Sequence, residues 1–387
     1  MSRRSIAFLK SGIQNRGGLE KYTLRLADAF ASHGHKAVIL TTDYASESCA
    51  KQKYEIVNLG TRCKLSLLHL LRFDSACRKY IDEHEFDFVF GMDRNFCPQT
   101  HYRAGNGVHA AYLDRRKLHS GFLKSLSFSL NPLHHMILQM EKSTFESAHL
   151  QTLFTNSHMV KEEVLRYYNV KPEKICVVHN GVEWNELEKP FEEGLRMRQV
   201  LQRQLGLRPD RFQFLFIGND YQRKGLDLLL QALSRFEKKN FELSVCGKER
   251  HPELYEKKAR ELGLQDHVRF FGAVKEIKTF YSVADALVIP SMYDPFANVT
   301  VEALAMGVYV ISSSANGGSE VITSDNEGLV FSDLQDPDEL TSCLEKAMMR
   351  PKTDARALQI RQKVAHLDYS IQLNKIVNRV VTSPLFC

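Results

Sequence analysis

Short apolar runs alternate with amphipathic stretches along most of the chain. The run at 5–9 predicts a strand, and apolar residues at helical spacing predict a helix at 19–33. Further strands are predicted at 36–41, 54–58, 86–90, 153–157 and 175–179, with helical stretches between them. Strands that alternate with helices are typical of a parallel sheet with crossover helices. The first part of the chain is therefore predicted to be an α/β domain.

The same alternation begins again after a polar, charged segment at 186–211. Strands are predicted at 212–218, 241–247, 268–272 and 286–290, and helices at 225–238 and 252–262. At 387 residues with 43% hydrophobic content, the chain is too long for a single ordinary core. We therefore expect an α/β chain of two similar domains with a cleft between them, at 1–182 and 183–365, and a helical segment at 366–387 that packs back on the first domain.

Hydropathy and cysteine spacing indicate the cellular compartment of the protein. No apolar run is long enough to span a bilayer, and the first ten residues do not resemble a signal peptide. The eight cysteines form no Cys-x-x-Cys pair, which argues for free thiols in a reducing compartment and against a zinc site. We therefore expect a cytoplasmic protein.

The positive charge is concentrated in the first half. Residues 1–180 contain 25 Lys and Arg against 17 Asp and Glu, a net charge of +8, whereas the whole chain carries +6. Such a basic half predicts an anionic partner, either membrane lipid, a phosphorylated acceptor or nucleic acid. Nucleic acid is not expected, because the chain contains no DNA-binding or RNA-binding motif and no basic run interleaved with aromatic residues.

The most informative segment, 291–307, sets two carboxylates eight positions apart across a strand-to-helix junction. Asp294 follows the apolar run 286–290, and Glu302 falls inside the next predicted helix. The residues between them place the N–H groups of a helix start beside the two acids: Phe296, Ala297, Asn298 and Val299. Carboxylates bind sugar hydroxyls and free amides bind phosphate. Taken alone, each acid is more often a helix cap or a solvated residue.

Two glycine-containing loops are candidates for phosphate binding. The loop 218–225 carries Arg223 and Lys224 at the carboxyl edge of its sheet, where adjacent cations suit a diphosphate. Gly218 and Asn219 open that loop and are predicted to contact the same ligand. The Gly17-Gly18 pair precedes the first helix and would let a phosphate approach the backbone. The alternatives are a solvated basic loop and a purely steric glycine turn.

Several segments together resemble the retaining glycosyltransferases of family 4. They are Asn180-Gly-Val182, Arg223-Lys-Gly225, Pro290-Ser291 leading into the acidic pair, and 317–322. The segments around Arg223 and Asp294 resemble the lipopolysaccharide core glucosyltransferase branch in particular. The resemblance implies the GT-B fold, in which two Rossmann-like domains face each other across a cleft. It also implies that the first domain binds the acceptor and the second binds a nucleotide sugar.

The resemblance also implies roles for individual residues. Glu302 matches the carboxylate that holds the ribose hydroxyls, and Asp294 matches the one that contacts the transferred sugar. The family pattern has Glu at this first position, so the shorter Asp294 leaves the sugar open. Arg223-Lys224 matches the diphosphate-stabilising pair, and Gly17-Gly18 matches the loop that closes on the phosphates.

The implied activity is retaining transfer of a hexose from a nucleotide diphosphate sugar, with UDP-glucose favoured, to a lipopolysaccharide-core or related glycolipid acceptor. No cofactor and no metal are expected, because Arg223, Lys224 and helix-end amides can neutralise a diphosphate. Asp336-Pro-Asp338 is the only Asp-x-Asp sequence and is expected to start a helix. The alternatives are a nucleotide-sugar epimerase of the same architecture and a catalytically silent nucleotide-sugar-binding protein.

Two segments of the first domain are candidates for the acceptor side. In 102–113 we predict that Arg103, Asn106 and His109 bind the acceptor, with His109 also a catalytic candidate; a structural His and an Arg paired with an acid are the alternatives. The segment 115–138 carries four Lys and Arg, no acid, and apolar residues along one helical face. Such a stretch can lie on an anionic leaflet, so we expect peripheral binding at the inner face of the cytoplasmic membrane. Packing against another helix is the alternative.

Overall fold

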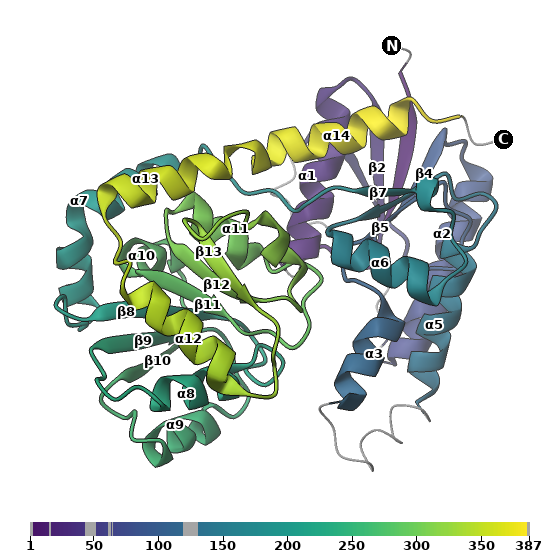
Figure 1. Cartoon of the computed structure of the whole chain (residues 1–387). Helices are drawn as coiled ribbons and strands as arrows, with labels where there is room; N and C mark the ends of the chain where they lie inside the picture. Colours follow the sequence, from purple (N-terminus) through teal and green to yellow (C-terminus); the bar gives the residue numbers. More distant parts are fainter. Residues whose placement is uncertain are drawn as a thin grey trace. The chain divides into compact units, whose positions relative to one another are not determined.

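The computed structural model describes residues 3–14, 17–42, 52–60, 63, 65–118 and 131–384. The chain divides into two compact units, which are coloured along the sequence in Figure 1. The N-terminal unit comprises Met1–His179 together with Ser370–Cys387, and the C-terminal unit comprises Asn180–Tyr369. The first division between them therefore falls immediately before the Asn180-Gly-Val182 segment.

The N-terminal unit is built on a parallel sheet that contains seven strands among its described residues, in the order β3-β2-β1-β4-β5-β6-β7. The strands are β1 (Ser5–Leu9), β2 (Lys36–Thr41), β3 (Glu55–Asn58), β4 (Phe88–Gly91), β5 (His101–Ala104), β6 (Thr152–Thr155) and β7 (Ile175–Val177). The helices are α1 (Gly18–Ser32), α2 (Ser66–Glu83), α3 (His109–Leu118), α5 (Pro132–Phe145), α6 (His158–Tyr167) and the C-terminal α14 (Tyr369–Val381). The alternation of strands and helices explains the parallel sheet.

Strand β5 was not predicted, because its sequence is polar. His101 is 0% exposed and lies among aromatic rings, including Phe90 and Phe154 at centroid distances of 6.0 and 6.3 Å. Burial lowers the pKa of His101 to about 3, with a smaller contribution from the positive charge of Arg379. The imidazole is therefore neutral near pH 7. Its Nε2 atom lies 3.3 Å from Oγ of Ser383, which follows α14 in the chain.

The C-terminal unit, described throughout, contains a parallel sheet of six strands in the order β10-β9-β8-β11-β12-β13. The strands are β8 (Phe212–Ile217), β9 (Phe241–Cys246), β10 (Val268–Gly272), β11 (Ala286–Ile289), β12 (Tyr309–Ser313) and β13 (Gly328–Phe331). The helices are α7 (Glu188–Gln204), α8 (Leu226–Ser234), α9 (Pro252–Glu261), α10 (Ile277–Val283), α11 (Asn298–Ala305), α12 (Pro337–Met348) and α13 (Asp354–Lys363). Asp336 caps α12, since its carboxylate accepts from the N–H of Asp338 at 2.9 Å.

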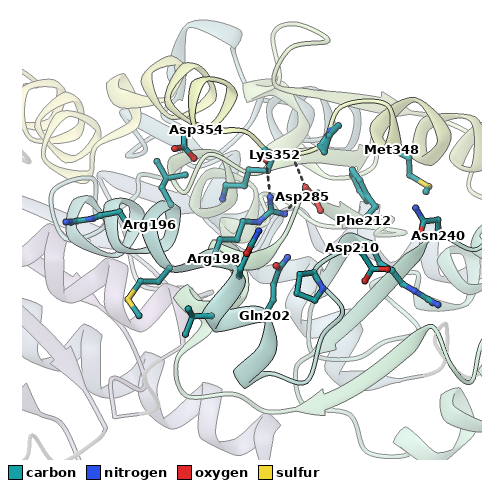
Figure 2. Close-up of a pocket in the computed structure, with 17 residues that line it drawn as sticks. Arg196, Arg198, Gln202, Asp210, Phe212, Asn240, Asp285, Met348, Lys352 and Asp354 are labelled. Carbon is teal, nitrogen blue, oxygen red and sulfur yellow. Dashed lines mark hydrogen bonds and ion pairs between the residues drawn. The ribbon is translucent and has the colours of Figure 1, made fainter.

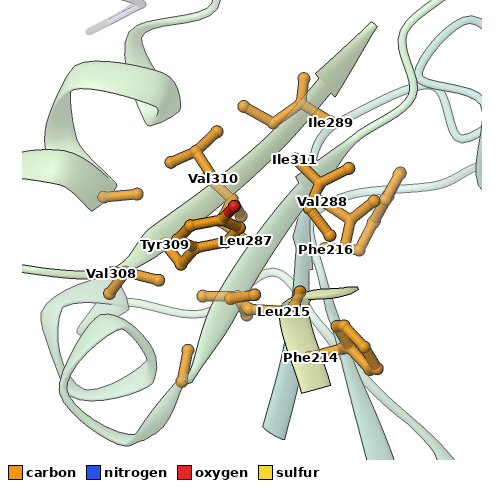
Figure 3. Close-up of a cluster of buried hydrophobic side chains, with 14 of the residues drawn as sticks. Phe214, Leu215, Phe216, Leu287, Val288, Ile289, Val308, Tyr309, Val310 and Ile311 are labelled. Atoms are coloured by element: carbon orange, nitrogen blue, oxygen red, sulfur yellow. The ribbon is translucent and has the colours of Figure 1, made fainter. Parts of the chain in front are cut away.

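The core of the C-terminal unit is the centre of its sheet. Figure 3 shows apolar side chains of three adjacent strands packed together, and all ten labelled residues are at most 4% exposed. They come from β8 (214–216), β11 (287–289) and β12 with the residue before it (308–311). Strands covered by helices on both faces read as continuous apolar runs, which is why the sequence identified β8 and β11. This rigid centre positions the loops that follow β8 and β11.

Candidate functional site

The candidate donor site lies at the carboxyl edge of the C-terminal sheet, where the loops after β8 and β11 meet. The N–H of Met292 donates to the carbonyl of Arg223 at 2.9 Å. Gly225 has a φ of +77°, and a Cβ atom there would lie 1.9 Å from the carbonyl oxygen of Pro290. Only glycine combines that backbone conformation with so close an approach. The glycine thus holds the two loops together.

This contact brings the predicted cations to Asp294. Nζ of Lys224 lies 2.5 Å from Oδ2 of Asp294, and Nη1 of Arg223 lies 3.5 Å from the same oxygen. Nη1 of Arg223 also donates to the carbonyl of Tyr293 at 3.2 Å. Asp294 is 8% exposed, so its charge is compensated mainly by these cations. The three charged residues selected from the sequence therefore form one cluster.

The backbone of Asp294 is held from both sides. Its N–H donates to the carbonyl of Ala315 at 3.0 Å, and its carbonyl accepts from the N–H of Gly317 at 2.8 Å. Its second carboxylate oxygen, Oδ1, accepts from the N–H of Phe296 at 3.2 Å. The carboxylate is therefore fixed between two cations and the chain that leads into α11.

Helix α11 presents its amino end to this cluster. Its cap residue is Ala297, so no side chain caps its first turn. At the other end, Nη1 of Arg361 donates to the carbonyl of Ala305 at 2.5 Å, and Nζ of Lys352 donates to the carbonyl of Met306 at 2.9 Å. The guanidinium of Arg361 at the carboxyl end complements the helix dipole, and the amino end favours an anion. The geometry suits a phosphate group beside Arg223.

Asn316 links α11 to the neighbouring loop, and sequence reasoning missed it. It is 0% exposed, and its Oδ1 accepts from the N–H groups of Ala297 and Gly318, both at 2.9 Å. Its Nδ2 donates to the hydroxyls of Thr300 at 3.1 Å and Ser312 at 3.0 Å. All of these partners are buried. The available signal was its place immediately before the Gly317-Gly318 motif.

Glu302 lies in the second turn of α11 and is partly buried. Its Oε2 accepts a hydrogen bond of 2.8 Å from the hydroxyl of Tyr281 on α10. Burial, reinforced by the Glu302 carboxylate, raises the pKa of Tyr281 well above its ordinary value, so the phenol keeps its proton. Nothing in the local sequence identified Tyr281 as a partner of Glu302.

The remaining predicted residues of this unit surround the cluster. Phe296 and Ala297 are buried at 5% and 4% exposure, and Oδ1 of Asn298 accepts from Nδ2 of Asn180 at 2.7 Å. Val299 is partly buried. In the loop after β8, Oδ1 of Asn219 accepts from the N–H of Lys248 at 2.7 Å. These contacts shape the loops around the charged cluster.

Gly218 approaches Lys224 closely. A Cβ atom at Gly218 would lie 2.7 Å from Cγ of Lys224. The carbonyl of Gly218 is itself approached by Gly247, where a Cβ would lie 2.0 Å from that oxygen. Glycine at 218 therefore leaves room for the stem of Lys224 beneath Asp294.

The Gly17-Gly18 pair begins α1 in the N-terminal unit. Gly17 is the cap residue and has no side chain that could cap the helix, and both glycines are exposed. The helix starts at Gly18, one residue earlier than predicted. An exposed helix start built from glycine leaves backbone N–H groups accessible to an anion.

The three predicted acceptor residues occupy different environments. Arg103 is 3% exposed, and its guanidinium carbon lies 3.6 Å from the centre of the Tyr22 ring. Asn106 is exposed in the turn between β5 and α3. His109 is 8% exposed and is the first residue of α3. The structure therefore leaves Asn106 accessible and buries the side chains of the other two.

His109 belongs to a buried polar network. Its N–H donates to both carboxylate oxygens of Glu141, at 3.0 and 2.9 Å, and its Nε2 lies 3.0 Å from Nδ1 of His134. Glu141 also binds Nε of Arg94 at 2.8 Å and the hydroxyl of Tyr168 at 2.7 Å. Burial, with smaller effects of Arg94 and His134, lowers the pKa of His109 to about 3. The network joins α3 to α5.

Much of the predicted membrane segment, 119–130, lies outside the described residues. Its described parts belong to α3 and α5. Nη2 of Arg115 lies 3.3 Å from Glu163, and Nη1 of Arg116 donates to the hydroxyl of Tyr112 at 3.1 Å. Within the described ranges, none of the helices is long and apolar enough to cross a membrane.

A separate pocket of about 680 Å³ opens at the opposite, amino edge of the C-terminal sheet. It is lined by residues at or before strand starts, such as Phe212, Asn240 and Asp285. Figure 2 shows Arg198, Asp285 and Lys352 close together in it, and Nη2 of Arg198 lies 2.7 Å from Oδ1 of Asp285. The pocket is therefore distinct from the cluster around Asp294.

Two family models match the chain and together span most of it. The model described as Glycosyltransferase Family 4 matches residues 16–185, and the model described as Glycosyl transferases group 1 matches residues 197–363. The chain belongs to the family 4 glycosyltransferases. The gap between the two matches, residues 186–196, contains the first part of α7 of this glycosyltransferase.

Curated relatives of this glycosyltransferase match over most of their length. The lipopolysaccharide glucosyltransferase WaaG of Escherichia coli is 22% identical over 335 residues, which is 86% of each chain. An uncharacterized glycosyltransferase of Methanocaldococcus jannaschii, MJ1607, is 27% identical over 332 residues, 81% of this chain and 80% of its own.

Solved structures agree with the fold. The crystal structure of WaaG matches with a TM-score of 0.78 at 21% identity, covering 98% of this chain and 100% of its own. Anabaena Alr3699/HepE in complex with UDP and glucose matches with a TM-score of 0.69 at 16% identity, covering 98% and 100%. The glycosyltransferase thus has two Rossmann-like parallel sheets of the GT-B type.

Proposed function

We propose that this glycosyltransferase moves a hexose, with retention of configuration, from a nucleotide diphosphate sugar to a lipopolysaccharide-core or related glycolipid acceptor. UDP-glucose is the favoured donor. The observation that supports the proposal best is the cluster of Arg223, Lys224 and Asp294 beside the amino end of α11. The name of the relative WaaG supports the choice of sugar and acceptor.

The diphosphate binds between the cations and α11. Arg223 offers several N–H donors to phosphate oxygens, and Lys224 supplies a point charge. Since Lys224 lies 2.5 Å from Asp294, donor binding makes the ammonium share its bonds between the carboxylate and the diphosphate. The same groups stabilise the negative charge that develops on the leaving nucleotide. They supply the neutralisation that a divalent cation would otherwise provide, so neither a metal nor a cofactor is required.

The two carboxylates bind the two sugars of the donor. Glu302 accepts hydrogen bonds from the ribose hydroxyls, and Asp294 contacts the transferred hexose. The leaving phosphate acts as the base for attack on the same face of the hexose, which gives retention without a protein nucleophile. Gly218, Asn219 and the residues Phe296 to Val299 shape the surroundings of the donor.

The N-terminal unit binds the acceptor. Arg103, Asn106 and His109 are its proposed contacts, and the backbone of Gly17-Gly18 binds phosphate oxygens. The positive charge of residues 1–180 and the basic segment 115–138 favour an anionic membrane surface, where a glycolipid acceptor is available. We propose peripheral association with the inner face of the cytoplasmic membrane.

A donor panel tests the proposed activity. The protein is incubated with several nucleotide sugars and truncated lipopolysaccharide cores, and nucleotide release and product mass are measured with and without EDTA. We expect hexose transfer from UDP-glucose that EDTA does not reduce. Donor binding without transfer to any acceptor would identify a silent binding protein, and interconversion of the sugar would identify an epimerase.

Membrane association is measured by sedimentation with vesicles that contain anionic lipid. We expect the protein to pellet with these vesicles and not with neutral ones. Neutralising Arg115, Arg116 and Lys117 together should reduce pelleting. Equal pelleting after that change would contradict the role of the segment.

A further inference from the structure

Tyr281 connects two helices of the C-terminal unit through its side chain. It lies on α10, is 1% exposed, and its hydroxyl donates to Oε2 of Glu302 on α11 at 2.8 Å. The donor is a neutral phenol and the acceptor is a carboxylate, so the bond is charge-assisted. A partly buried Glu would otherwise have several staggered conformations available to it.

The backbone of Tyr281 is fixed as firmly as its side chain. Nζ of Lys352 donates to the carbonyl of Tyr281 at 3.1 Å and to the carbonyl of Met306, at the end of α11, at 2.9 Å. This amino group therefore joins α10 to α11. The N–H of Lys352 in turn donates to Oδ1 of Asp285 at 2.8 Å, and Arg198 binds the same carboxylate, as Figure 2 shows.

These two connections hold Glu302 in one orientation relative to α11. We propose that Tyr281 is a positioning residue for nucleotide-sugar binding, which fixes the Glu302 carboxylate so that it can accept hydrogen bonds from the ribose hydroxyls. The inference rests on the proposed function, in which Glu302 contacts ribose. Tyr281 itself touches no reacting atom, and its ring is enclosed in the core.

The raised pKa of Tyr281 supports this role. Burial and the nearby carboxylate keep the phenol protonated, so it remains a donor to Glu302 at neutral and mildly alkaline pH. A lysine ammonium or a water molecule in its place has more than one hydrogen to donate and would restrict the orientation of the carboxylate less than the single O–H of the phenol. The phenol thus sets the orientation of one carboxylate oxygen without adding charge to the ribose site.

Substitution of Tyr281 by Phe tests the inference, because it removes the hydroxyl and keeps the ring. We expect the KM for the nucleotide sugar to rise roughly tenfold while kcat changes less than about twofold, since ribose contacts are made equally in the ground state and the transition state. Partial unfolding would lower kcat and leave KM unchanged, so it cannot imitate this result.

Two further measurements separate positioning from general packing. In an enzyme that already carries Glu302→Gln, adding Tyr281→Phe should raise KM less than about twofold, because the two changes act through one contact. A donor that lacks the ribose hydroxyls should likewise be bound equally by Tyr281→Phe and the unchanged enzyme. A tenfold rise in KM that persists in either case would overturn the inference.

Tyr309→Phe is the matched control. Tyr309 begins β12 in the same unit and is 4% exposed. Its hydroxyl donates to the carbonyl of Asp325 at 3.0 Å. Its loss should change the free energy of unfolding and leave KM unchanged. If the unchanged enzyme binds no nucleotide sugar at all, the proposed function fails. If it binds donor normally and Tyr281→Phe leaves KM unchanged, only the present inference fails.

Discussion

Nζ of Lys224 lies 2.5 Å from Oδ2 of Asp294, so a cation expected to bind diphosphate and an acid expected to bind sugar bind each other. Both side chains are 12% exposed. The pair fixes both groups at the carboxyl edge of the sheet, and Arg223 adds a second cation at 3.5 Å. The cluster is therefore preorganised to bind a ligand that is negatively charged at one end and polar at the other.

Replacing Lys224 by Gln removes the positive charge and retains a polar side chain. We expect kcat to fall about 100-fold, because the charge that develops on the leaving nucleotide loses one preorganised partner. Steady-state nucleotide release measures the effect. Lys238→Gln, at an exposed position of the same unit, is the control and should leave kcat unchanged. A loss below about threefold in Lys224→Gln would contradict the assignment.

Gly225→Ala should destabilise the C-terminal unit. The added Cβ would meet the carbonyl oxygen of Pro290 at 1.9 Å in a backbone with φ of +77°. We expect the free energy of unfolding to fall by more than about 2 kcal/mol.

Gly263→Ala provides a matched control for that change. Its φ is +66°, and a Cβ there meets nothing within 4 Å, so it carries the backbone strain without the collision. We expect it to cost about 1 kcal/mol. Urea titration of both variants measures the difference in the free energy of unfolding. Equal losses in the two variants would show that the loops containing Gly225 and Pro290 can move apart to relieve the collision at no energetic cost.

The free energy of unfolding should fall as the pH decreases below about 6.5, the ordinary pKa of histidine. Burial lowers the pKa of His101 and of His109 to about 3, so both rings are neutral in the folded protein and take up a proton on unfolding. Between these pKa values each contributes a slope of about 1.4 kcal/mol per pH unit. His101→Gln should therefore have a shallower slope in urea titrations between pH 7 and 5. An unchanged slope would mean that the His101 ring is already charged in the folded state.

Asn316→Asp tests whether an amide is required between α11 and its neighbours. Aspartate has no N–H to donate to Thr300 and Ser312, and it adds a charge at a position that is 0% exposed. We expect the free energy of unfolding to fall by about 2–3 kcal/mol. The exposed Asn326→Asp is the control and should have little effect.

The sequence predicted most of the strands from their apolar runs but missed β5, β12 and β13, although the apolar run 308–311 of β12 is continuous. Strands β8 and β11 were predicted because helices cover both faces of their sheet. Strand β5 was missed because it carries buried His101 and Arg103, whose neighbours come from other strands and helices.

In the candidate site, too, the sequence revealed residues that belong to local motifs and not residues whose partners are distant in the chain. Arg223, Lys224, Asp294 and Glu302 were selected because they occur in short segments with a recognisable pattern. Tyr281 could not be selected, since its partner is on a different helix and no spacing rule relates the two. The role of each selected residue stays a prediction until it is measured.

The burial of the Asn316 amide also affects which asparagine of this protein loses ammonia during storage. Asn316 precedes Gly317, and Asn-Gly sequences lose ammonia readily when the glycine nitrogen can attack the side-chain carbonyl. Here the N–H of Gly317 donates to the carbonyl of Asp294 at 2.8 Å, and the Asn316 side chain is held by four hydrogen bonds. The third Asn-Gly sequence begins at Asn180, which is buried and donates from Nδ2 to Oδ1 of Asn298, whereas Asn106 precedes Gly107 in an exposed turn. Deamidation in stored protein should therefore begin at Asn106. Deamidation at Asn316 would indicate that the molecule had already unfolded.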